Sequence, residues 1–202
     1  MLQPNYRGSS GYGDAFEQAG FGQWGRKMQT DLSDGVSTLA AQGIIDPQRV
    51  CIVGASYGGY AALAGVTLQQ GIYRCAVAVA GPSDMSAFFM WQLERHRRSG
   101  DATRYWRAVT GADKEGDATM RSISPAYFAD KARSPILLIH GRDDTVVPIA
   151  QSQRMASALQ HANKSVEFIE MKGEDHWLSR DETRKTMLKA AIEFVRKYNP
   201  PN

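Results

Sequence analysis

Short apolar runs alternate along the chain with longer segments in which apolar residues recur at helical spacing. The runs predict strands at 2–6, 49–54, 74–80, 135–140 and 165–171. The periodic segments predict helices at 24–42, 57–70, 149–161 and 181–198. Several strand segments are continuously apolar, as strands buried on both faces of a parallel sheet are. The pattern therefore predicts an α/β fold, with a mostly parallel sheet and helices on both faces.

Two stretches depart from this alternation. Residues from about 84 to 130 are rich in aromatic residues and arginine, and they predict an inserted helical excursion. The strand-like start runs directly into a glycine-rich segment at 7–13, without the crossover connection that parallel strands need. We therefore expect residues 1–202 to form one partial domain that lacks the first strands of its sheet.

Composition and charge narrow the class of protein. The 202 residues are 43% hydrophobic and 22% charged, which is typical of a soluble globular domain. The net charge of +3 is spread along the chain, so we expect no nucleic-acid partner. No apolar run reaches the roughly 20 residues of a membrane span, and the start does not resemble a signal peptide. We expect no membrane partner, with the cytoplasm slightly favoured over the periplasm.

The two cysteines, Cys51 and Cys75, each lie in an apolar segment. A free cysteine behaves as a small apolar residue, so they are interpreted as two buried thiols on neighbouring strands. Neither has the spacing of a metal ligand, and no metal site is predicted.

The strongest candidate for chemistry is the segment Gly54-Ala55-Ser56-Tyr57-Gly58, between a predicted strand and a predicted helix. In such a nucleophile elbow the serine occupies a tight turn, and the flanking glycines allow close approach of the backbone. The Tyr57 amide, at the helix start, is the expected donor to an oxyanion. A glycine-rich helix start that merely packs on the sheet is the alternative.

A serine needs a base and an orienting carboxylate, and both follow in the order that α/β-hydrolases use. Asp144 lies in a polar loop after a predicted strand, and His176 lies in a loop after the next one. Both loops are expected at the carboxyl edge of the sheet, where ligands of such folds bind. Asp143 is the alternative orienting acid. We interpret His140, at a strand end, as a structural hydrogen bonder.

The other two histidines and a cluster of basic residues are expected on the surface of the protein. His96 lies within a basic cluster at 95–98, and His161 lies near a helix end. A solvated helix face is the simplest interpretation of the cluster, and a carboxylate-binding or subunit contact is the alternative.

The chain resembles the C-terminal catalytic domain of the prolyl oligopeptidase family, particularly its acylaminoacyl-peptidase and dipeptidyl-aminopeptidase branches. The resemblance covers nearly the whole chain and rests on residues 5–13, 24–25, 31, 34, 46–50, 54–60, 140–148 and 174–176. It implies an α/β-hydrolase fold and a peptide substrate cleaved through an acyl-enzyme. It assigns Ser56 as nucleophile, Asp144 as acid and His176 as base, and it implies no cofactor.

The resemblance also implies parts that this sequence does not contain. Family members carry an upstream His-Gly-Gly-like segment, an oxyanion-hole tyrosine and a β-propeller domain. Loss of one oxyanion donor costs about 10²- to 10³-fold in turnover, so we expect the 202-residue chain to be nearly inactive. A homo-oligomer is a further possible partner.

The family lines its first specificity pocket where Phe88, Phe89 and Trp91 lie in this sequence. The resemblance thus implies an apolar preference at that subsite, and packing of these aromatics in a core is the alternative. Two other functions stay open, a carboxylesterase or lipase-like hydrolase with the same triad and a noncatalytic domain.

Overall fold

The computed structural model describes residues 1–96, 100–112 and 117–201. The chain divides into two compact units, a helical unit of Met1–Pro47 with Met85–Ser124 and a sheet unit of Gln48–Asp84 with Pro125–Asn202. The helical unit contains α1 (Asp14–Gln18), α2 (Lys27–Ala41), α4 (Met85–Arg95), α5 (Gly100–Thr110) and α6 (Ala118–Ser122). The sheet unit contains β1 (Cys51–Ala55), α3 (Tyr57–Thr67), β2 (Cys75–Val79), the 3-10 helix η1 (Pro125–Lys131), β3 (Ile136–Gly141), α7 (Ala150–His161), β4 (Val166–Met171) and α8 (Asp181–Tyr198).

Among the described residues the sheet is parallel, with four strands in the order β1-β2-β3-β4. Because every strand pair is parallel, the carboxyl ends of all the strands lie at one edge of the sheet. The predicted parallel sheet and four of the five predicted strands are confirmed. The strand predicted at 2–6 is wrong. Pro4 has no N–H to donate to a ladder, and the segment instead places the Leu2 side chain against Gly35 of α2.

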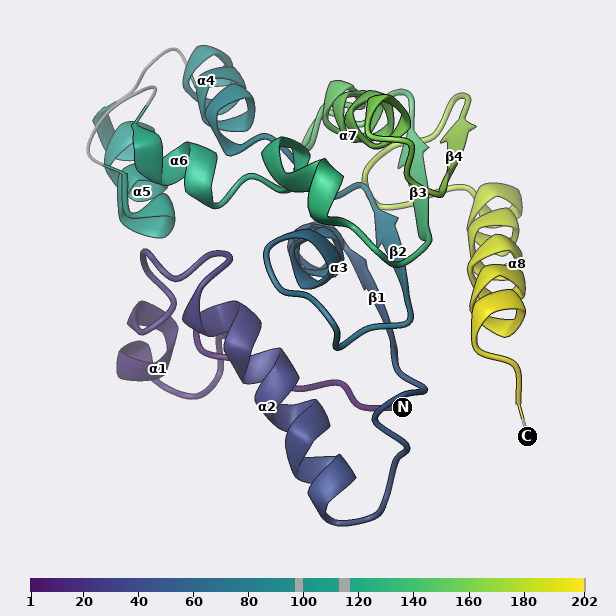
Figure 1. The fold of residues 1–202 in the computed structure, drawn as a ribbon. Coiled ribbons are helices and arrows are strands. Elements are labelled where there is room, and N and C mark those ends of the chain that lie inside the picture. The colour runs from purple at the N-terminus through teal and green to yellow at the C-terminus, as the bar shows by residue number, and fades with distance from the viewer. Residues whose placement is uncertain (97–99, 113–116, 202) are drawn as a thin grey trace. The chain divides into compact units, whose positions relative to one another are not determined.

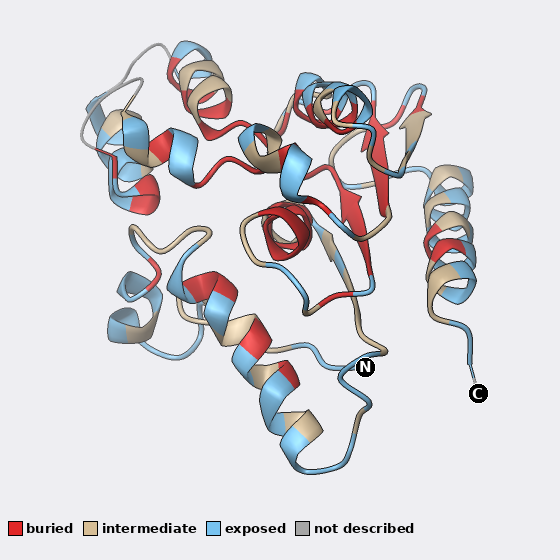
Figure 2. Ribbon diagram, viewed as in Figure 1, coloured by how far each residue is buried: buried red, intermediate tan, exposed pale blue. Residues whose placement is uncertain are grey.

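Helices cover both faces of the sheet, with α3 and α7 on one face and α8 on the other (Figure 1). Alternation along the strands points Val77, Leu137 and Ile139 toward α8, where they pack with Phe194. The opposite face receives α3, which is buried from Gly59 through Thr67. Figure 2 shows this burial continuing through β2 and β3. The loop that carries Asp144 therefore follows the fully buried strand β3, whereas Ser56 and His176 follow β1 and β4, which are partly exposed.

The outer edge of β1 has no neighbouring strand among the residues that the structure describes. The apolar sequence of β1 predicted a strand buried on both faces. The side chains of β1 are instead only partly buried, and Val53 is 55% exposed. A strand is buried on both faces only where other elements pack over it, and the apolar pattern of the strand does not show whether such elements are present.

The two cysteines lie directly opposite each other on β1 and β2, as expected of neighbouring strands. The predicted free thiols are wrong, because Cys51 and Cys75 form a disulfide. Their Cα atoms are 4.7 Å apart, within the range that a disulfide spans. This pairing depends on strand register, which a separation of 24 residues does not reveal.

Long-range contacts tie the segments of the helical unit together. The Arg7 guanidinium binds the Asp31 carboxylate of α2 through two hydrogen bonds of 2.7 Å, and this contact lowers the pKa of Asp31. The Gly22 amide donates to the Val109 carbonyl of α5. No helix among the described residues is long and apolar enough to cross a membrane.

Candidate active site

Ser56 occupies the turn between β1 and α3 in a strained conformation. Its φ of 56° lies in the left-handed region that non-glycine residues rarely adopt. The turn is held because the Ser56 amide donates to the Val79 carbonyl of β2 at 2.8 Å. A Cβ at Gly54 would overlap the Gly58 carbonyl, so glycine is required there. The sequence therefore builds the elbow through close backbone approach, as its glycines predict.

Tyr57 is the first residue of α3, so its backbone N–H points out of the N-terminal end of the helix. This end carries the positive pole of the helix dipole. A negative charge that develops on an atom bound to Ser56 would therefore be stabilised by the start of α3.

The loop after β3 buries one carboxylate and exposes its neighbour. Both Val146 and Val147 donate their amides to Asp144 Oδ1 at 2.8 Å, whereas Asp143 is exposed. The adjacent aspartates thus have different environments. Of the two carboxylates that the sequence left open, the structure brings Asp144 to the histidine.

The loop after β4 is fixed by its own acidic side chains. Asp175 Oδ1 accepts from the amides of Trp177 and Ser179, and its Oδ2 accepts from the Ser179 hydroxyl. Glu174 is 1% exposed and accepts from the Asp175 amide and from the Thr183 hydroxyl of α8. These contacts hold the intervening residue, His176, from both sides.

A backbone hydrogen bond joins the acid loop to the base loop. The Asp143 amide donates to the Glu174 carbonyl at 2.9 Å. Gly141 allows this approach, because a Cβ at that position would overlap the Glu174 backbone. The two loops therefore form one rigid edge that carries both Asp144 and His176.

Ser56, His176 and Asp144 form a continuous hydrogen-bonded chain. The Ser56 Oγ lies 3.0 Å from His176 Nε2, and His176 Nδ1 lies 2.7 Å from Asp144 Oδ2. An ionised carboxylate can only accept, so the imidazole proton lies on Nδ1 and the Nε2 lone pair accepts from the serine hydroxyl. This arrangement can remove a proton from Ser56 as that oxygen attacks an electrophile.

The Asp144 side chain is fully buried. Burial and hydrogen bonding shift the pKa of its carboxyl in opposite directions. Burial raises the pKa of its carboxyl, but hydrogen bonds from His140, His176 and the amides of Val147 and Val146 lower it more. The net effect holds the pKa of Asp144 well below its ordinary value. Asp144 is therefore ionised at neutral pH despite its burial.

Two further side chains, His140 and Trp177, contact the triad. His140 is fully buried and places Nε2 3.2 Å from Asp144 Oδ2, which fits its predicted structural role and adds a direct contact with the acid. Trp177 is 75% exposed, with its indole ring edge-on to the His176 imidazole at 5.2 Å between centroids. His140 lies near the end of β3, four residues before Asp144 in the following loop, and this placement is the sequence signal for the first contact.

The aromatic residues of the predicted specificity pocket belong to the helical unit. Phe88 and Phe89 are buried on α4, and the Phe88 ring contacts those of Trp91 and Trp106. Their packing fits the core interpretation, and the pocket stays a prediction.

The histidines predicted to lie on the surface, His96 and His161, are exposed. In the basic cluster Arg95 is exposed and lies over the Trp91 ring, whereas Arg97 and Arg98 lie outside the described residues.

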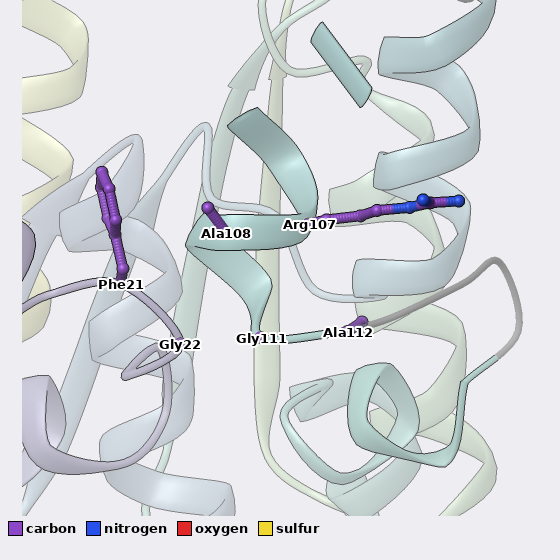
Figure 3. A pocket seen from close by; sticks show the side chains of 6 residues that line it. All are labelled: Phe21, Gly22, Arg107, Ala108, Gly111 and Ala112. Carbon is purple, nitrogen blue, oxygen red and sulfur yellow. The ribbon is translucent and has the colours of Figure 1, made fainter. Parts of the chain in front are cut away.

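A hollow of about 460 Å³ lies in the helical unit (Figure 3). It is lined by Phe21, Gly22, Arg107, Ala108, Gly111 and Ala112. The Arg107 side chain extends away from Phe21 (Figure 3), and it is the one charged side chain among the six described lining residues. Across the described part of the chain, no group of three or more acidic, histidine or cysteine side chains could hold a metal ion.

The parallel sheet, with its elbow serine and its two following loops, has the α/β-hydrolase fold, as predicted. Residues 1–200 match the sequence pattern of the prolyl oligopeptidase family. The chain therefore belongs to that family, and the resemblance found in the sequence is confirmed.

Relatives of known class support this membership. Dipeptidyl peptidase family member 6 of Caenorhabditis elegans is 33% identical over 186 residues, which are 87% of this chain and 24% of that protein. Dipeptidyl aminopeptidase BIII of Pseudoxanthomonas mexicana is 34% identical over 195 residues, which are 92% of this chain and 27% of that protein. The chain thus spans about a quarter of the length of these curated relatives.

Solved structures agree on the fold. A puromycin-hydrolyzing peptidase of Mycobacterium tuberculosis superposes with a TM-score of 0.89 at 30% identity, covering 98% of this chain and 29% of that one. The acylaminoacyl peptidase of Pyrococcus horikoshii superposes with a TM-score of 0.84 at 24% identity, covering 98% of this chain and 32% of that one.

Proposed function

We propose that this chain is part of the catalytic domain of a serine peptidase. The enzyme hydrolyses oligopeptides, or N-acyl or dipeptidyl units at peptide N-termini, through an acyl-enzyme on Ser56. The hydrogen-bonded chain from Ser56 Oγ through His176 to Asp144 carries the proposal. Membership of the prolyl oligopeptidase family supports a peptide substrate.

The proposed reaction begins when Ser56 Oγ attacks the carbonyl carbon of the scissile amide while its proton passes to His176 Nε2. The Asp144 carboxylate, 2.7 Å from Nδ1, stabilises the resulting imidazolium. The Tyr57 amide donates to the oxyanion of the tetrahedral intermediate. The intermediate collapses when His176 gives its proton to the leaving amine.

The second half of the reaction repeats these roles with water. His176 takes a proton from a water molecule, whose oxygen attacks the acyl carbon of the Ser56 ester. The intermediate then releases the carboxylic acid, and the proton returns from His176 to Ser56 Oγ.

The longer protein completes this site in our proposal. The family resemblance places a second oxyanion donor, further strands and a β-propeller before this segment. The outer edge of β1, with Val53 exposed, is where we expect an additional strand to pair. Phe88, Phe89 and Trp91 are kept as the proposed apolar specificity pocket, and a homo-oligomer as a possible assembly.

Substrate panels offered to the longer protein test the proposal. N-acyl-amino-acid anilides, dipeptidyl anilides and simple chromogenic esters would be compared, with Ser56→Ala as the control. We expect anilide turnover that is lost in Ser56→Ala. Turnover of esters without any anilide would instead identify an esterase, and no turnover of either class would favour a noncatalytic domain.

A further inference from the structure

The triad carboxylate has a second imidazole partner besides His176. His140 Nε2 lies 3.2 Å from Asp144 Oδ2, the same oxygen that accepts from His176 Nδ1. We propose that His140 is a positioning residue, a neutral imidazole that orients Asp144 toward His176. The inference rests on the proposed function of the triad.

The surroundings of His140 fix its tautomer. Its Nε2 faces two acceptors, Asp144 Oδ2 and the Val147 carbonyl at 2.9 Å, so this nitrogen carries the proton. Its Nδ1 lies 2.7 Å from the Ser152 hydroxyl, which can donate to that nitrogen. Both ring nitrogens of the fully buried side chain are therefore satisfied in the neutral form.

The position of His140 makes it a fixed support for the acid. It lies near the end of β3, and its partners lie in the loop that follows and on α7. The amides of Val146 and Val147 hold Asp144 Oδ1, and the two imidazoles hold Oδ2. His176 changes its charge during turnover, whereas the Nε2–H of His140 faces the Val147 carbonyl and Oδ2 throughout. It thereby keeps the carboxylate oriented when the base is neutral.

Two substitutions separate this contact from the packing of the ring. In His140→Gln, the side-chain amide nitrogen reaches the place of Nε2 and can donate to Asp144. In His140→Asn, the shorter side chain can accept from Ser152 at the place of Nδ1 but does not reach Asp144. Ser152→Ala removes the other contact and leaves the donor to Asp144 in place.

The variants would be made in the longer protein and assayed with an anilide substrate that it turns over. We expect His140→Asn to lower kcat about 10- to 100-fold with little change in KM, because a hydrogen bond to a charged group is lost. His140→Gln should retain kcat within about threefold, and Ser152→Ala should do the same. Equal losses in the Asn and Gln variants would overturn the proposal, since packing would then explain both.

A proton spectrum gives a readout that does not depend on turnover. The Nδ1 proton of His176, shared with Asp144, should give a strongly downfield resonance in the native protein and in His140→Gln. In His140→Asn the resonance should shift or broaden, and an unchanged resonance with native kcat would contradict the proposal. If the Asn variant does not fold, loss of kcat in folded His140→Gln would overturn it and native kcat would support it.

Failure of the proposed function looks different from failure of this inference. A native protein that turns over no substrate contradicts the function, yet the resonance still reports whether His140 orients Asp144.

Discussion

His176 Nδ1 lies 2.7 Å from Asp144 Oδ2, while the adjacent Asp143 is exposed. The backbone explains this difference. The Asp143 amide donates to the Glu174 carbonyl of the base loop, and the amides of Val146 and Val147 hold the Asp144 carboxylate inward. The same loop geometry therefore selects one aspartate and brings the histidine to it.

Neighbouring aspartates offer a matched pair of variants. We expect Asp144→Asn to lower kcat for an anilide substrate of the longer protein by about 10⁴-fold, because an amide favours the wrong imidazole tautomer. Asp143→Asn should stay within about threefold of the native value. Equal losses in both variants, measured under saturating substrate, would contradict the assignment of the acid.

The elbow offers a second matched pair, in stability. A Cβ at Gly54 would overlap the Gly58 carbonyl, whereas a Cβ at Gly58 would meet no atom within 4 Å. We expect Gly54→Ala to lower the free energy of unfolding by about 3 kcal/mol or more, through overpacking. Gly58→Ala should be neutral or stabilise α3 by up to about 1 kcal/mol. Urea denaturation of both variants checks this, and equal stabilities would refute the close approach.

The disulfide is expected to stabilise the sheet unit. Closing a loop between Cys51 and Cys75, 24 residues apart, should contribute about 3 kcal/mol to the free energy of unfolding. Cys51→Ser with Cys75→Ser should lose that amount. Alkylation of the unfolded protein without reductant should label neither cysteine. Labelling of both would show that they are free thiols.

Acid should weaken the fold partly through Asp144. The folded pKa of this carboxyl is lowered, so Asp144 stabilises the folded state above the unfolded value of about 3.9. That contribution is lost as the pH falls from about 4 toward the folded value. The difference in free energy of unfolding between native protein and Asp144→Asn should therefore shrink from pH 5 to pH 2. A difference that stays constant over this range would contradict the lowered pKa.

The sequence predicted those parts of the molecule that depend on local chemistry. Strand and helix periodicity located four strands, and the glycines around Ser56 located the elbow. Features that depend on contacts between distant segments escaped it. The disulfide needs the register of β1 against β2. The family resemblance already assigns Asp144 as the acid, and the hydrogen bonds of the folded loop give the physical reason. The exposure of Val53 depends on which elements pack against β1, and the apolar sequence of the strand does not predict them.

The most direct test of the account is covalent labelling of Ser56 by a fluorophosphonate probe. The longer protein would be treated with the probe, digested and mapped by mass spectrometry, with Ser56→Ala and Asp143→Asn treated in parallel. We predict one added probe mass on the peptide that contains Ser56, retained in Asp143→Asn and absent in Ser56→Ala. A folded protein that takes up no probe, or one labelled equally in Ser56→Ala, would contradict a catalytic serine at this turn.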